Sequence, residues 1–203
     1  LLTGLLASQN FNSKLTGDKS LSSRPMDRIA KPLSLMNAKI ITDNGKLPIN
    51  IVGNELTNAT INIEVPSAQI KSGLIFAALN TKGKTIIIEN SITRDHTEIM
   101  LEAFDADIII RKEKTKKIIE INGKKELKSK NIIVPSDLSS SAFFIVAALI
   151  NDNSKITLKN ININPTRNGI LMALKKMGAK ITYKNKIEIN SEEVCDIDVE
   201  SSN

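Results

Sequence analysis

The stretch Gly83-Lys84-Thr85-Ile86-Ile87-Ile88-Glu89-Asn90 decides the fold, because it recurs as Asn153-Ser154-Lys155-Ile156-Thr157-Leu158-Lys159-Asn160. Residues 11–18 have the same shape. The alternating or β-branched apolar residues predict that each copy is a strand. An apolar helix is expected ahead of each strand, over residues 1–7, 70–79 and 142–150. The chain is therefore a repeat of helix-then-strand units.

A loop with one arginine follows each of these strands. The arginines are Arg24, Arg94 and Arg167, and each precedes a second amphipathic helix that ends at a short turn before another strand. The alanines of these turns, at positions 38, 106 and 179, lie 68 and 73 residues apart. That period is too long for one turn of a solenoid and suits a complete supersecondary unit.

Two strands are expected at the end of each unit. They are predicted over residues 47–52 with 60–65, over residues 117–121 with 131–134, and over residues 186–189. With the helices on one side of a sheet, the fold class is α/β. The nearest approach to a linker is the polar, lysine-rich segment 123–130.

In two units a similar segment precedes the apolar helix. These segments are Val65-Pro66-Ser67-Ala68-Gln69 and Val134-Pro135-Ser136-Asp137. Each predicts a strand end, a proline and a serine cap ahead of an apolar helix. Backbone N–H groups at a helix N-terminus bind anions, and the hydroxyl of Ser67 and the amide of Gln69 could complete such a site. Capping alone would also account for Ser67, so both interpretations stay open.

The loop arginines place guanidinium groups on one edge of the sheet, where they could grip phosphates or carboxylates. The alternative is a local ion pair, for example between Arg94 and Asp95 or Glu98. For Arg24 and Arg94 both interpretations are open, and for Arg167 the local pair is favoured. No spacing of the acidic residues predicts a catalytic pair.

The composition excludes several classes of protein. Apolar residues make up 41% of the 203 residues and charged residues 25%, which excludes disorder, and 9 glycines exclude collagen. The longest apolar run, residues 142–150, is less than half of the ~20 residues that span a bilayer. The net charge of +6 predicts an anionic ligand, but 3% aromatic residues without Trp leave few stacking platforms for nucleic acid.

The basic cluster at positions 111–117 is expected to be a solvated face. Its members are Arg111, Lys112, Lys114, Lys116 and Lys117. The single His96 makes metal chemistry improbable, and we expect it to be a first-turn polar residue rather than a catalytic base.

Cys195 is the only cysteine, so no intramolecular disulfide can form, and a reducing, cytoplasmic location is expected. The start at Leu1, without Met or a basic leader, predicts a fragment without a signal peptide.

Several motifs, in order along the whole chain, resemble the 5-enolpyruvylshikimate-3-phosphate (EPSP) synthase family, the 3-phosphoshikimate 1-carboxyvinyltransferases. They are Leu15-Thr16-Gly17-Asp18-Lys19-Ser20-Leu21-Ser22-Ser23-Arg24-Pro25-Met26-Asp27-Arg28, Val65-Pro66-Ser67-Ala68-Gln69-Ile70-Lys71-Ser72, Thr93-Arg94-Asp95-His96-Thr97-Glu98, Val134-Pro135-Ser136-Asp137-Leu138-Ser139-Ser140-Ser141-Ala142 and Asn164-Pro165-Thr166-Arg167. Ser-Ala-Gln at positions 67–69, rather than Ser-Ser-Gln, resembles the class II branch.

The resemblance implies transfer of the enolpyruvyl group of phosphoenolpyruvate to the 5-hydroxyl of shikimate 3-phosphate, with release of phosphate, in aromatic amino acid biosynthesis. It implies that Ser67, the backbone of Ala68, Gln69 and Arg94 hold shikimate 3-phosphate, and that Arg24 and Gln69 face phosphoenolpyruvate. No metal or organic cofactor, nucleic acid or membrane is implied, and the parent protein is expected to be monomeric.

The family fold implies two domains built from βαβαββ units, with the active site between them. Residues 1–134 would form most of one domain and residues 135–203 the first part of the other. The sequence begins after the place of the family's Asn-x-Gly-Thr-x-x-Arg motif and ends before its acid–base Asp and Lys-Glu-x-x-Arg motif. The resemblance therefore places no catalytic acid–base residue in this chain, and we expect the chain alone to be inactive.

Two alternative functions stay open. The sister enzyme that transfers enolpyruvyl to UDP-N-acetylglucosamine resembles the chain less, because that family carries a cysteine shortly before the Arg-Pro and residues 18–23 contain none. A basic RNA-binding module would fit the positive charge, but the scarce aromatic residues and the repeated arginines count against it.

Overall fold

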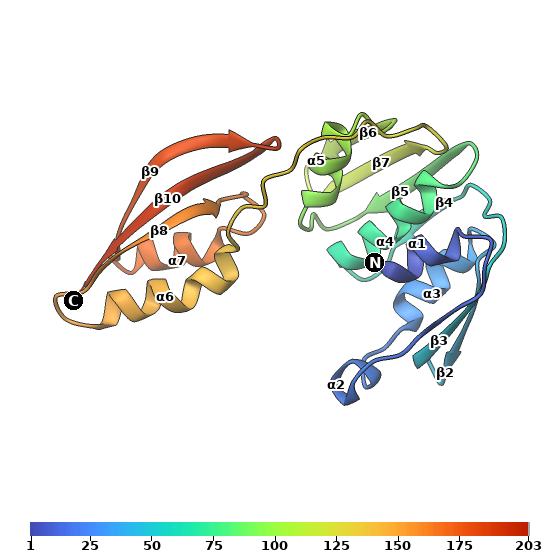
Figure 1. Ribbon diagram of the computed structural model, residues 1–203, viewed down its shortest axis with the longest axis horizontal. Helices are drawn as coiled ribbons and strands as arrows, with labels where there is room; N and C mark the ends of the chain where they lie inside the picture. Colours follow the sequence, from blue (N-terminus) through green and yellow to red (C-terminus); the bar gives the residue numbers. More distant parts are fainter. Residues whose placement is uncertain (203) are drawn as a thin grey trace. The chain divides into compact units, whose positions relative to one another are not determined.

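The computed structural model describes residues 1–202, which divide into two compact units, Leu1–Lys128 and a second unit that begins at Ser129 (Figure 1). The first contains α1 (Leu2–Ala7), β1 (Ser13–Leu15), α2 (Lys19–Ser22), α3 (Asp27–Ser34), β2 (Lys39–Asp43), β3 (Lys46–Val52), β4 (Thr60–Ile63), α4 (Ala68–Leu79), β5 (Lys84–Glu89), α5 (His96–Ala103), β6 (Ile108–Glu113) and β7 (Lys116–Asn122). The second contains α6 (Leu138–Ile150), β8 (Lys155–Asn162), α7 (Gly169–Lys176), β9 (Lys180–Ile189) and β10 (Glu192–Glu200). The α/β class is confirmed.

The sheets confirm the predicted repeat. Their strand orders are β1-β3-β2, β4-β5-β7-β6 and β8-β10-β9, so the last strand of each copy lies between the two strands that precede it in the chain. The middle copy, β4-α4-β5-α5-β6-β7, is a complete βαβαββ unit. Its first strand is parallel to β5, from Thr60 opposite Ile86 to Ile63 opposite Glu89. The prediction that residues 60–65 close the preceding copy is therefore wrong, because β4 opens the next one.

The turn after the second helix is built in the same way in all three copies. Asn37, Asp105 and Gly178 have positive φ angles of 64°, 60° and 90°. The alanine that follows each of them donates its backbone N–H to a leucine carbonyl five residues earlier, at 3.2 Å to Leu33, 3.0 Å to Leu101 and 3.0 Å to Leu174. This is the Schellman helix end, which favours glycine or asparagine at the left-handed position. The sequence repeat therefore reflects a repeated helix C-terminus.

Helix α4 is the centre of the core of the first unit. Eight of its 12 residues are buried, on all sides of the helix, and it packs against α1, α3, β5 and β7. Its crossing with α1 depends on glycine: a Cβ atom at Gly4 would lie 1.8 Å from the carbonyl oxygen of Gly73. The first residues of α4 are thus fixed by packing along the whole helix.

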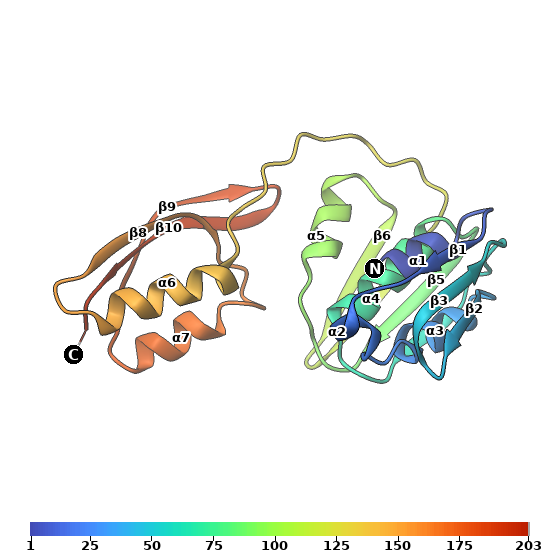
Figure 2. The same ribbon diagram turned by 60° about the horizontal axis from the view of Figure 1, so that its bottom comes forward.

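In the second unit, α6 and α7 lie side by side on one face of the sheet, as both views show (Figure 2). The core between these layers is formed by residues of α6, the sheet and α7, among them Ile145, Leu171 and Ile197, none of which exposes any surface. This arrangement agrees with the predicted layer of helices on one side.

Two predictions at the entrance of this unit are wrong. Residues 131–134 form no strand, and Val134 is 84% exposed, because the described residues offer this segment no neighbouring strand. Only Ser136 pairs with the sheet, by one parallel bridge to Ile161, in the place that β4 has in the middle copy. The cap of α6 is Asp137 rather than Ser136, since its Oδ2 accepts the backbone N–H of Ser140 at 2.9 Å.

The central strand β10 is not predicted from the sequence, because its acidic residues hide the apolar pattern. Six of its nine residues, 194–199, are buried. The carboxylate of Asp196 accepts hydrogen bonds from Lys159 Nζ at 2.7 Å and Asn185 Nδ2 at 2.8 Å, and these bonds lower its pKa to about 2. The buried acids of β10 are therefore matched by side chains of β8 and β9.

Candidate active site

The N-terminus of α4 presents the Ser-Ala-Gln sequence. Ser67 is the cap, as predicted: its backbone is extended, and its hydroxyl accepts the backbone N–H of Ile70 at 3.4 Å. The side chain of Gln69 is exposed. The first N–H groups of a helix have no partner within the helix, and the helix dipole places partial positive charge there. This end of α4 is therefore suited to an anion.

Arg94 belongs to the segment that connects β5 to α5, and its exposed side chain lines a cavity of about 220 Å³ with the start of α4. The lining residues, which define the Arg94 cavity, are Leu1, Ala68, Gln69, Ser72, Arg94, His96 and Thr97. Three of the four residues predicted to hold shikimate 3-phosphate thus meet at one cavity. Ser67 is not among them and lies beside it as the cap of α4.

A second cavity, of about 370 Å³, has Arg24 on its wall. We call it the Arg24 cavity; its polar lining includes Arg24, Arg28, Gln69 and Thr16, and no acidic residue. Gln69 therefore lines both cavities. Arg28, the second residue of α3, is a cation that sequence reasoning did not assign to the site.

The local-pair alternative for Arg94 is not what the structure contains. The carboxylate of Glu98 pairs with Lys71 Nζ at 2.8 Å and Lys117 Nζ at 3.2 Å, and that of Asp95 lies 3.6 Å from Lys117 Nζ. Arg94 makes no ion pair within residues 1–202. Its guanidinium group is thus available to a ligand.

Arg167, at the equivalent place in the second unit, forms an ion pair within the chain, as favoured from the sequence, but its partner Asp137 lies 30 residues earlier rather than beside it. Its guanidinium lies 3.2 Å from Asp137 Oδ1 and also contacts the hydroxyl of Ser139. Hydrogen bonds from Ser140, with a smaller contribution from the charge of Arg167, lower the pKa of Asp137 below its ordinary value. The three loop arginines are therefore equivalent in topology but not in their contacts.

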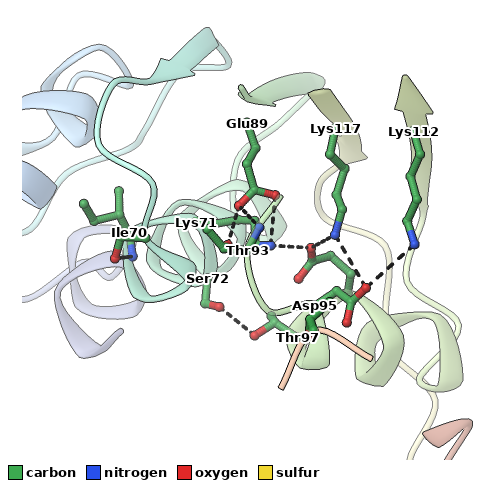
Figure 3. Close-up of polar contacts among 12 residues, drawn as sticks. Ile70, Lys71, Ser72, Glu89, Thr93, Asp95, Thr97, Lys112 and Lys117 are labelled. Carbon is green, nitrogen blue, oxygen red and sulfur yellow. Dashed lines mark hydrogen bonds and ion pairs between the residues drawn. The ribbon is translucent and has the colours of Figure 1, made fainter. Parts of the chain in front are cut away.

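A buried ion network lies behind Arg94 and was missed by sequence reasoning (Figure 3). Lys71, Glu89, Glu98 and Lys117 each expose at most 1% of their side chains. The prediction that the basic cluster at 111–117 is a solvated face is wrong for Lys117, which points from the sheet toward α5 and meets these acids. The acids and bases of this network lie on different elements and become neighbours only in the folded chain. No local sequence pattern therefore predicts it.

Two classes of site find no support in the part of the chain that the structure describes. Residues 1–202 hold no group of three or more His, Cys, Asp or Glu side chains that could bind a metal ion. Among the same residues, no helix combines the length and the apolar character that crossing a membrane requires.

Two solved structures share the fold of this chain. A solved structure of the enolpyruvyl transferase NikO from Streptomyces tendae superposes with a TM-score of 0.70 at 16% identity, covering 100% of this chain and 46% of that one, which shows a shared fold. EPSP synthase from Acinetobacter baumannii superposes with a TM-score of 0.85 at 44% identity, covering 100% and 45%.

A family model described as EPSP synthase (3-phosphoshikimate 1-carboxyvinyltransferase) matches residues 1–202, and the chain belongs to this family. Relatives named 3-phosphoshikimate 1-carboxyvinyltransferase are 48% identical in Magnetococcus marinus and 46% identical in Ruthia magnifica. The matches cover 100% and 99% of this chain but 45% and 46% of the relatives. The chain thus spans about half the length of the curated relatives it matches.

Proposed function

We propose that this chain supplies substrate-binding residues to a 3-phosphoshikimate 1-carboxyvinyltransferase. The observation that carries the proposal is the position of Gln69, which lines two cavities that each carry an arginine. Shikimate 3-phosphate would occupy the Arg94 cavity, and phosphoenolpyruvate the Arg24 cavity. Both substrates are anions, and a donor between them is suited to hold the two reacting groups close together.

The chemistry requires more than these residues. Transfer of the enolpyruvyl group joins the 5-hydroxyl oxygen of shikimate 3-phosphate to C2 of phosphoenolpyruvate and releases phosphate. The attacking hydroxyl loses a proton and the methylene carbon gains one transiently, so a positioned acid–base group is needed. We place that group in the remainder of the protein, and we expect this chain by itself to bind substrate without turnover.

The organisation of the whole protein follows the same proposal. Residues 1–134 would form most of one domain, and residues 135–203 the first part of the second. We further propose a monomeric parent protein in the cytoplasm. The family match favours this function over transfer to UDP-N-acetylglucosamine, and the scarce aromatic residues count against RNA binding.

Calorimetric titration of shikimate 3-phosphate tests the binding half of the proposal. We expect Arg94→Ala to weaken binding by about tenfold or more, since a hydrogen bond between charged groups contributes ~1.5 to 3 kcal/mol. Gln69→Ala should also weaken it, and Arg24→Ala should affect it least. Arg167→Ala is the matched control, because its guanidinium already pairs with Asp137. Equal affinity for all four variants would refute the assignment of the Arg94 cavity.

A further inference from the structure

Both sequence neighbours of Arg94 are anchored by charged side chains, of which Glu89 and Lys117 are buried and Lys112 is exposed. On one side, Thr93 donates its backbone N–H to Glu89 Oε1 at 2.9 Å, and its hydroxyl donates to the same oxygen. On the other side, Asp95 Oδ2 lies 3.6 Å from Lys117 Nζ and 3.8 Å from Lys112 Nζ. The backbone of Arg94 is therefore held at both ends while its side chain is exposed.

The two anchors belong to one continuous chain of contacts. Glu89 Oε2 lies 3.2 Å from Lys71 Nζ, which lies 2.8 Å from Glu98 Oε1, which lies 3.2 Å from Lys117 Nζ. Figure 3 shows Lys71 of α4, Glu89 of β5 and Lys117 of β7 gathered in this network. The contacts thus run from Thr93 to Asp95, the two residues that flank Arg94.

The same network joins Arg94 to Gln69. Lys71 is two residues after Gln69 in α4, and the hydroxyl of Ser72 bonds that of Thr97 in α5 at 2.7 Å. Ser72 and Thr97 both line the Arg94 cavity. The network therefore fixes the helix that carries the glutamine relative to the loop that carries the arginine.

Stability alone gives little reason for this network. Moving charges out of water is costly, and well-packed apolar residues in their place are often equally or more stabilising. Glu98 Oε2 is buried with no hydrogen-bond partner in the described part of the chain, so the desolvation of this carboxylate is only partly offset.

We propose that Glu89 and Thr93 are positioning residues, which hold the backbone of Arg94 so that its guanidinium meets an anionic, phosphorylated ligand in the Arg94 cavity. This inference rests on the proposed function only for the identity of the ligand. The anchoring of the loop is independent of the proposed function. Neither Glu89 nor Thr93 is among the residues that line the cavity, so they act through Arg94.

The test removes one hydroxyl. Thr93→Val keeps the shape of the side chain and the backbone bond to Glu89 but loses the bond from the hydroxyl, whereas Thr93→Ser keeps both bonds. The matched control is Thr85→Val in the same strand-and-loop segment, because Thr85 Oγ1 is buried and has no hydrogen-bond partner in the described residues. Two readouts are measured for each protein: calorimetric affinity for shikimate 3-phosphate, and the ¹⁵N heteronuclear NOE of the Arg94 backbone amide without ligand.

We expect Thr93→Val to weaken binding by about tenfold and to lower the NOE of Arg94, because a hydrogen bond to a charged acceptor is lost. Thr93→Ser should restore both values to within about twofold of the original, and Thr85→Val should change neither. If Thr93→Val binds as tightly as the original chain, the positioning role is wrong. If the original chain does not bind the ligand, the proposed function fails, and the NOE alone decides whether the loop is anchored as proposed.

Discussion

Replacement of Lys71 by methionine should destabilise the first unit strongly. Lys71 is completely buried, and its Nζ joins Glu89 to Glu98, at 3.2 and 2.8 Å. Methionine fills a similar volume but leaves two buried carboxylates without this cation. Removal of one partner from a buried ion pair costs about 3 to 5 kcal/mol, which is a large part of the stability of a typical domain.

The control for this variant is Lys82→Met, which makes the same chemical change at the surface. Lys82 is 79% exposed, and its partner Glu55 is 70% exposed, at an Nζ–Oε1 distance of 3.2 Å. Exposed pairs contribute roughly 0.2 to 1 kcal/mol, so we expect almost no change in the free energy of unfolding. The difference between the two variants therefore isolates the effect of burial.

Urea unfolding provides the assay. The chain contains no Trp and one tyrosine, Tyr183, which lies in β9 of the second unit. Tyrosine fluorescence thus follows the second unit, while circular dichroism at 222 nm follows both units. We expect Lys71→Met to shift only the dichroism transition. A free energy of unfolding within about 1 kcal/mol of the original would refute the importance of the network, because buried pairs that matter cost ~3 kcal/mol or more.

Two further predictions concern packing and pH. Gly4→Ala should destabilise the first unit by about 3 kcal/mol or more in the same urea assay. Overpacking commonly costs about 1 to 3 kcal/mol, and the Cβ atom of the new alanine would lie 1.8 Å from a backbone oxygen. The control is Gly169→Ala, where a Cβ atom would meet nothing within 4 Å, and it should stabilise the second unit slightly. The pKa of Asp196 falls from its ordinary 3.8 to about 2 in the folded chain, so its contribution to stability is present above pH 4 and is lost between about pH 4 and pH 2. Asp196→Asn should remove that part of the pH dependence of unfolding, and an unchanged slope would contradict it.

Local patterns were sufficient to predict the repeat. The alanine turns recur because each second helix ends with a left-handed residue, and such ends have a strong local preference for Asn or Gly. The cap at Ser67 also follows from nearest neighbours along the chain, whereas the partner of Arg167, Asp137, lies 30 residues earlier. Features that depend on a few adjacent residues are therefore visible in the sequence.

Features that depend on distant partners are not visible there. The apolar segment 131–134 has a strand-like pattern but no strand beside it among the described residues, whereas β10 is rich in acids and becomes the central strand because β8 and β9 supply its partners. Lys117 belongs to a basic run, yet it is buried because its Nζ contacts the carboxylates of Glu98 and Asp95 from another part of the chain. The same limitation hides Arg28 and the buried ion network from sequence reasoning.

Amide chemical-shift mapping of this chain with shikimate 3-phosphate tests directly whether this ligand binds in the Arg94 cavity. We expect the largest changes at Ala68, Gln69, Arg94 and Thr97. The amides of the second unit, including that of Arg167, should stay unchanged and serve as an internal reference. Changes centred on Arg167, or no saturable change anywhere in a folded chain, would contradict this expectation.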